Sequence, residues 1–190
     1  MTQAPLRGFF SCTEKELKDN AQESYNNVEG HRVLDGGSVC EDVTSITLPT
    51  VEHPTTTISA SGMAMDVDMP NTTHLNAMEL SIAHNNGVNC RYLATPGKHN
   101  IEMRVVRQRY NVAGVEIEHE SLKVRATCVH KSTDKGTIET GNPYGSTEKY
   151  SIIRYEEEQD GEIITIVDAA SGIMRFNGVD YTDVVESMLN

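Results

Sequence analysis

The clearest structural signal in the sequence is the stretch at residues 150–167, YSIIRYEEEQDGEIITIV. Segments rich in Ile, Val and Tyr lie on both sides of Asp160-Gly161, a pair typical of tight reversals between antiparallel strands. We therefore predict a β-hairpin in which Tyr150–Glu157 pairs with Glu162–Val167.

Upstream of this hairpin, apolar and polar residues alternate with a period of two in several segments. Further strands are predicted at residues 43–48, 65–69, 78–83, 101–105, 115–118 and 122–128, with turns or loops at 85–87 and 136–145. Many short alternating strands are typical of a β-sandwich or barrel. We predict a mainly β fold, an antiparallel β-sandwich or half-barrel, with a short C-terminal helix from about Tyr181 to Leu189.

The composition also favours strands. The chain has 17 Val, 12 Ile and 18 Thr, so 47 of its 190 residues are β-branched, against only 9 Leu. β-branched side chains suit a pleated sheet better than a helix. Apolar content is only 37%, without Trp, which hints at a thin core that gains stability from neighbouring copies.

The net charge of -12 excludes a protein that grips nucleic-acid phosphates, since that requires an excess of Lys and Arg. It also argues against docking on an anionic membrane. No stretch is long and apolar enough for a membrane span, and Met1–Leu6 lacks a signal-peptide layout, which predicts a cytoplasmic product.

Residues 1–30 differ from the rest of the chain. Thr13 is a residue of the N-cap type and precedes charges of alternating sign, so a short helix is plausible as far as Asn26. We interpret 1–30 as an extension or arm, with a frayed terminus as an equal alternative, and 31–190 as the β-domain. The polar connection from Thr50 to Met63 is long enough to indicate a functional or disordered loop.

Chemical motifs are largely missing. Asp66 and Asp68 would share one face of a strand, but the other oxygen ligands of a calcium site are not supplied, so an exposed acidic face is favoured over a metal site. The seven histidines are dispersed, and no nucleotide-binding or nucleophile motif occurs. We predict neither an enzyme nor a cofactor.

The cysteines leave two alternatives open. No CxxC pair occurs, so a zinc site is not indicated. The thiols are either buried and idle, or able to form disulfides between subunits outside a reducing cell. The residues concerned are Cys12, Cys40, Cys90 and Cys128.

The C-terminal end has a recognisable order of motifs: the Asp160-Gly161 turn, a strand ending in Asp168, and Asn177-Gly178-Val179-Asp180 before a terminal helix. In this order it resembles the major tail tube protein of contractile-tailed phages. A second match begins at Ser45-Ile46-Thr47-Leu48-Pro49-Thr50 and continues with Gly62-Met63 and Val67-Asp68. Two departures are Ser171, where the family has Asn, and the neutral Thr55–Thr57, where the family is rich in charge.

The resemblance implies a structural subunit whose inner strands join a multi-subunit barrel. Hexameric rings would stack into a tube that conducts DNA into the host, with DNA as passing cargo without specific binding and no membrane partner. The expected partners are further copies of the chain and the sheath, tape measure, baseplate and terminator proteins. The expected location is the virion tail, after assembly in the host cytoplasm. The alternative is a β-sandwich binding module, or a related secretion-tube or adhesin protein.

The resemblance also assigns surfaces. Ring-to-ring contacts are expected in the loop from Pro49 to Met63, at Pro49, Thr50, Glu52, Thr55, Thr56, Thr57, Ser59, Gly62 and Met63. The lumen is expected to be lined by carboxylates that repel DNA, at Asp66, Asp68, Glu116 and Glu118, although an ordinary wet sheet face would show the same alternation. In the Asn177–Asp180 motif, Asn-Gly allows positive φ and Asp180 can cap the following helix.

Overall fold

The computed structural model describes residues 23–62, 64–85, 88–111, 116–183 and 187–188, with the backbone alone at 23–26, 88–89, 111 and 116. Nearly all regular elements are strands. They are β1 (Glu23–Asp35), β2 (Ser38–Cys40), β3 (Val43–Thr47), β4 (Thr55–Ile58), β5 (Val67–Pro70), β6 (Glu79–His84), β7 (Lys98–Asn111), β8 (Glu116–Asp134), β9 (Ser146–Gln159), β10 (Glu162–Asp168), β11 (Ile173–Phe176) and β12 (Val179–Asp180), with one 3-10 helix, η1 (Val88–Ala94).

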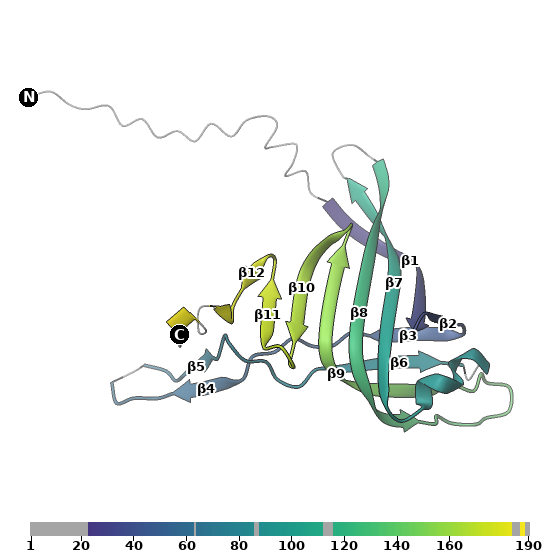
Figure 1. Ribbon diagram of the computed structural model, residues 1–190, viewed down its shortest axis with the longest axis horizontal. Helices are drawn as coiled ribbons and strands as arrows, with labels where there is room; N and C mark the ends of the chain where they lie inside the picture. The colour runs from purple at the N-terminus through teal and green to yellow at the C-terminus, as the bar shows by residue number, and fades with distance from the viewer. Residues whose placement is uncertain (1–22, 63, 86–87, 112–115, 184–186, 189–190) are drawn as a thin grey trace, which may run out of the picture.

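The main sheet is antiparallel and branched. Its strand order is β12-β11-β10-β9-β8-β7-β1-β2, and β6 joins it by pairing with the first half of β9, while β3 pairs with β6. In Figure 1, β3 and β6 run across the long strands β7–β10. The β8–β9 ladder has register shifts between Thr127 and Cys128 and between His130 and Ser132. Such bulges bend strands, so the sheet folds over itself.

The core lies inside this fold. Ile101 and Met103 of β7 and Val124 of β8 are almost completely buried, and Leu80 and Ile82 of β6 meet them from the crossing layer. Residues between these positions are more exposed, as a period of two requires. The observed architecture is the predicted mainly β half-barrel, and the sheet does not close.

The C-terminal hairpin has the predicted form. Gln159 pairs with Glu162, and Asp160 and Gly161 have φ of 47° and 87°. Positive φ at both turn residues matches the right-handed twist of the flanking strands. This confirms the strongest prediction made from the sequence.

Three predictions needed correction. The helix proposed as far as Asn26 is wrong over 23–26, because these residues belong to β1 and pair with β7; its earlier part lies outside the described residues. The predicted strands at 115–118 and 122–128 are one strand, β8, because β7 pairs with it without a break. Thr50–Met63 is not wholly irregular, because it contains β4, which pairs with β5.

Candidate functional site

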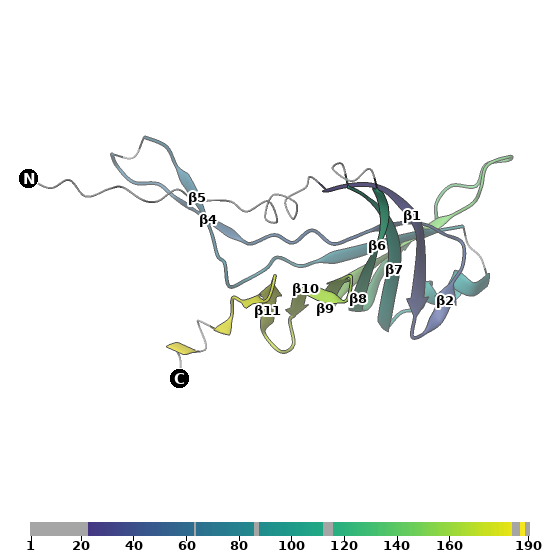
Figure 2. The same ribbon diagram turned by 90° about the horizontal axis from the view of Figure 1, so that it is seen from above.

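A protruding hairpin formed by β4 and β5 is the first candidate surface. It is a separate two-stranded sheet and lies beyond the end of the main sheet in both views (Figures 1 and 2). All four β4 residues are exposed, and so are Ile58, Met65 and Met69. The hairpin therefore offers strand edges and apolar side chains to a partner.

The base of this hairpin is fixed by hydrogen bonds. The His53 imidazole contacts the carbonyl oxygens of Asn71 at 3.0 Å and His74 at 2.8 Å through Nδ1. The Asn71 amide donates to the Pro54 carbonyl at 2.8 Å, and the Asn76 amide to the Glu52 carbonyl at 2.8 Å. These bonds join the outgoing and returning chains, so the hairpin is a positioned arm.

The residues expected to stack rings lie on or before this arm. Pro49, Thr50 and Glu52 lead to it, Thr55–Thr57 form β4, and Ser59 and Gly62 follow β4. Met63 lies outside the described residues. Thr57 Oγ1 donates to Asp68 Oδ1 at 2.6 Å, which shows that the neutral threonines take part in hydrogen bonding within the arm.

Of the four carboxylates expected in the lumen, the three whose side chains are described do not lie on one sheet. Asp66 and Asp68 belong to the hairpin, because β5 pairs with β4 and not with the main sheet. Glu118 lies on β8, where it accepts from Arg109 Nη2 at 2.6 Å and Nε at 3.0 Å. By strand alternation it shares the side of the buried Leu122 and Val124. The Glu116 side chain lies outside the described residues.

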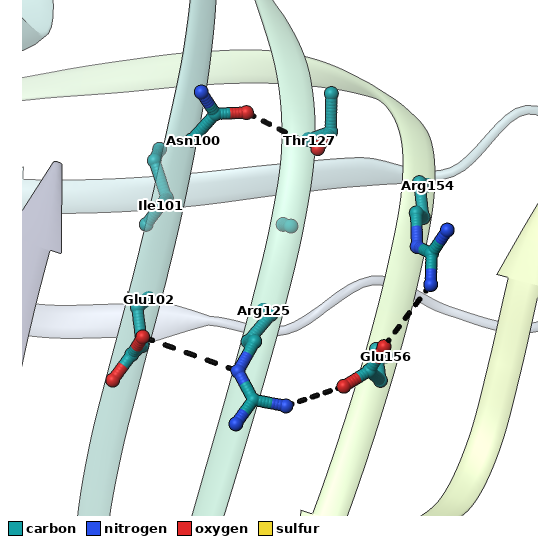
Figure 3. A pocket seen from close by; sticks show the side chains of 8 residues that line it. Asn100, Ile101, Glu102, Arg125, Thr127, Arg154 and Glu156 are labelled. Carbon is teal, nitrogen blue, oxygen red and sulfur yellow. Dashed lines mark hydrogen bonds and ion pairs between the residues drawn. The ribbon is translucent and has the colours of Figure 1, made fainter. Parts of the chain in front are cut away.

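A ladder of paired charges, missed by sequence reasoning, lies on the polar face of β7, β8 and β9, and Figure 3 shows the part of it that includes Glu102, Arg125, Arg154 and Glu156. Arg125 at its centre contacts Glu156, Glu158 Oε2 at 2.9 Å and Glu102 Oε2 at 4.0 Å. Lys123 Nζ lies 3.0 Å from Glu158 Oε1, and Arg104 Nε lies 2.6 Å from Glu102 Oε1. We call these residues the charge ladder, and we include Arg154 and Asp168, which are described in the next paragraph.

The ladder continues to the next strand. Arg154 contacts Glu156 Oε2 at 3.3 Å and Asp168 Oδ2 of β10 at 3.3 Å. Four cations thus meet four carboxylates, which makes the ladder electrically balanced although the chain carries -12. The cations are Arg104, Lys123, Arg125 and Arg154, and the carboxylates are Glu102, Glu156, Glu158 and Asp168.

The pairing also affects proton affinities. The hydrogen bond from Lys123 lowers the pKa of Glu158, and Arg125 acts in the same direction. Burial opposes the charged form of Arg125, but its hydrogen bonds to Glu156 and Glu158 outweigh this and raise its pKa. Both shifts favour the charged forms, so Glu158 and Arg125 stay ionised around neutral pH.

The Asn177–Asp180 motif forms the turn between β11 and β12. Asn177 and Gly178 have φ of 49° and 79°. Asp180 Oδ1 accepts from the Thr182 amide at 3.0 Å and from Thr182 Oγ1 at 2.8 Å, and these bonds lower the Asp180 pKa. Asp183, Ser187 and Met188 are helical, and the rest of the predicted helix beyond Asp183 lies outside the described residues.

The cysteine geometry does not favour disulfides between subunits. Cys40, Cys90 and Cys128 are free and buried, with at most 4% of their surface exposed. Burial raises the pKa of Cys90 to about 11 and that of Cys128 to about 12, and a protonated thiol is a poor nucleophile. Cys12 lies outside the described residues.

A buried polar cluster lies where the main sheet bends. Glu148 of β9 is 1% exposed, and its carboxylate lies 3.0 Å from His130 Nε2 and 3.6 Å from His84 Nε2. It joins β6, β8 and β9. Over the described residues, no group of three or more His, Cys, Asp or Glu is placed to hold a metal ion.

The fold defines the class of protein as mainly β, with a branched antiparallel sheet and a separate β4–β5 hairpin. Residues 30–189 match the family of the phage tail tube protein FII. The chain belongs to this family and is a structural subunit of a phage tail tube. No helix in the described part of the chain could span a membrane.

Two solved structures are similar to this chain. One is a chain from the structure of the sheath/tube terminator of the extracellular contractile injection system PVC in its extended state, with TM-score 0.48 and 12% identity over 70% of this chain and 96% of that chain. The other is a chain of the PVC sheath-tube complex in the extended state, with TM-score 0.47 and 12% identity over 78% and 99% of the two chains. A search of curated proteins gives no match.

Proposed function

We propose that the chain forms hexameric rings that stack through the β4–β5 hairpin into the inner tube of a contractile phage tail, and that DNA passes through this tube to the host. The hairpin supports stacking because it stands apart from the main sheet with exposed Ile58 and Met69. We further propose that strands of neighbouring subunits pair at free sheet edges, which would protect those edges from unspecific pairing.

The charge ladder is the observation that carries the role as a DNA conduit. DNA binds surfaces whose Lys and Arg can displace its counterions. In the ladder, Arg125, Lys123 and Arg154 are each already in contact with a carboxylate. A channel lined by this face would be wet and polar without gripping phosphate. We therefore assign the ladder face to the lumen, and we assign Asp66 and Asp68 to the ring contacts of the hairpin.

We also propose which proteins contact the tube and where the tube is assembled. The tube would lie inside a contractile sheath and contact the tape measure, baseplate and terminator proteins. Assembly would take place in the host cytoplasm and the product would lie in the virion tail. The subunit would act by assembly and not by catalysis.

Electron microscopy of the purified full-length chain tests this proposal. We expect hollow tubes of stacked rings, and a reconstruction in which Arg125 and Glu156 face the axis. A protein that stays monomeric at all concentrations would exclude self-assembly and favour a binding module. Tubes whose ladder faces outward would retain the assembly role and overturn the assignment of the lumen. Adding the sheath protein should give a tube coated by sheath.

A further inference from the structure

An apolar groove opens between β1 and β3 on the unclosed side of the half-barrel. It has a volume of about 390 Å³, which lies in the range of pockets that hold small ligands. Met103, Leu122 and Val124 form its buried floor, and Val28 and Leu48 stand at its rim with 59% and 40% of their surface exposed. Among the residues that the structure describes, none covers this opening into the protein core.

The two strands that border the groove also have free edges. Within the described residues, β3 pairs only with β6, and β1 pairs with β2 only over Val33–Asp35 on the side away from β7. The direct link across the gap is the His31 Nε2 contact to the Val43 carbonyl, at 3.3 Å. Backbone groups along an unpaired edge can accept an additional segment.

The chain itself carries a segment suited to this groove. Residues 1–22 precede β1, which borders the groove, and they contain Leu6 and two of the three phenylalanines of the chain, Phe9 and Phe10. The family match begins at residue 30, so this segment lies outside the matched region. Adjacent aromatic residues in a polar segment indicate an anchor that is buried against apolar surface.

The length of the segment permits docking within one chain. Val28 lies five residues after Glu23, which corresponds to about 17 Å along a strand. Phe10 lies 13 residues before Glu23, and a stretch of that length can span up to roughly 45 Å. Phe10 can therefore turn back and reach the groove of its own subunit. A tethered ligand also has a high effective concentration, which favours this groove over that of a second copy.

We infer that the segment Leu6–Phe10 of each chain docks in the β1–β3 groove of the same chain, with Phe9 and Phe10 covering the floor formed by Met103, Leu122 and Val124. This gives the N-terminal extension an apolar contact surface on its own subunit. The docking is independent of the proposed stacking and of the assignment of the lumen.

Photo-crosslinking of the full-length chain tests this inference. p-Benzoylphenylalanine is placed at position 9 or 10, the protein is irradiated below the concentration at which it assembles, and the products are mapped by mass spectrometry. We expect the main crosslinks at groove residues such as Val28 and Leu48. Crosslinks elsewhere, or no crosslinks, would overturn the inference. In a mixture of isotope-labelled and unlabelled chains, products that join the two would also overturn it, in favour of a second copy.

Hydrogen exchange provides a measurement without a foreign side chain. With the double substitution Phe9→Ser and Phe10→Ser, we expect amides of Val43–Thr47 to exchange about tenfold faster or more, because the segment leaves the groove. Leu17→Ser, in the same extension, is the matched control and should leave exchange unchanged. Equal exchange in the double variant and the unmodified chain would contradict docking. Leu48→Asp at the rim should reproduce the effect, whereas Ile138→Asp, 79% exposed and away from the groove, should not.

Discussion

The charge ladder and the β4–β5 hairpin are both surface regions, but they differ in whether their side chains already have partners within the subunit. In the ladder, Arg125 and its neighbours find carboxylates within the same subunit, so little interaction capacity is left for other molecules. In the hairpin, Ile58, Met65 and Met69 are exposed, and their apolar surface is open to a partner. The first region suits a surface past which a polyanion slides, and the second suits a surface that adheres to another subunit. Variants that exchange these properties test the comparison.

The largest effect is expected in the hairpin. The double substitution Ile58→Asp and Met69→Asp places charges where apolar side chains would be buried between rings, which is costly when the charges are unpaired. We expect at least a tenfold loss of tubes, measured by sedimentation and microscopy. The thermal stability of the subunit should be almost unchanged, because both residues are already exposed.

Ile138→Asp is the matched control for this experiment. Ile138 is 79% exposed and lies in the loop between β8 and β9, away from the hairpin. It should leave assembly unchanged. Normal tubes from the hairpin double variant would show that stacking uses another surface.

The second effect is expected in the ladder. Replacing Glu156 and Glu158 by Gln removes the carboxylates nearest to Arg125 and also the partner of Lys123. Assembled tubes should then retain DNA on the order of tenfold more strongly at low salt, and the excess should disappear as salt is raised. The measurement is DNA co-sedimentation with tubes over a salt series.

The control for the ladder variant removes the same charge elsewhere. Glu139→Gln and Glu162→Gln together alter the net charge equally but lie outside the ladder, and both side chains are exposed. If this control retained as much DNA as the ladder variant, total charge and not the paired face would govern passage.

The third effect is expected in the turn between β11 and β12, which belongs neither to the charge ladder nor to the β4–β5 hairpin. Gly178 has φ of +79°, and a Cβ added there would meet no heavy atom within 4 Å, so the cost of Gly178→Val is backbone strain and not a clash. We expect a loss of about 1–3 kcal/mol in the free energy of unfolding, measured by denaturant unfolding, with a lower yield of tubes. Gly30→Val is the control, because Gly30 also has open space but no positive φ. Equal losses in both variants would refute strain as the cause.

The sequence predicted local pairing well and distant pairing poorly. The Asp160-Gly161 hairpin was recognisable because its turn chemistry and both strands are adjacent in the chain. The strand of Val67–Asp68 was also visible as an alternation, but alternation does not name the partner strand. Its pairing with β4 and not with the main sheet is the reason why we now propose Asp66 and Asp68 for the ring contacts of the hairpin.

The charge ladder was hidden for the same reason. Each of its strands shows charges at every second position, such as Lys123 and Arg125, and this signal was available in the sequence. The charge balance of this face depends on the strand register, which sets Arg125 opposite both Glu102 and Glu156. Register depends on tertiary contacts, so the alternation indicated an acidic lumen where we now propose a balanced one.

The smallest effect is a pH dependence inside the subunit. His99 Nδ1 lies 2.6 Å from Asp35 Oδ2, and both side chains are largely buried. Burial opposes protonation of His99, but the hydrogen bond to Asp35 and the one to the Thr95 carbonyl outweigh it and raise the His99 pKa. The folded state holds this proton more tightly than the unfolded state does. The His99–Asp35 pair therefore gives its full stabilisation of the folded state at pH values below the pKa of the unfolded histidine. The contribution is lost as pH rises through the folded pKa.

We therefore expect the subunit to lose a small part of its stability as the pH rises from below about 6.5, the ordinary histidine pKa, to alkaline values. His99→Gln should flatten this slope in denaturant unfolding measured across the series. His119→Gln is the control, since His119 is 59% exposed beside Glu29 and its loss should leave the slope intact. A slope unchanged by His99→Gln would place the titrating group elsewhere.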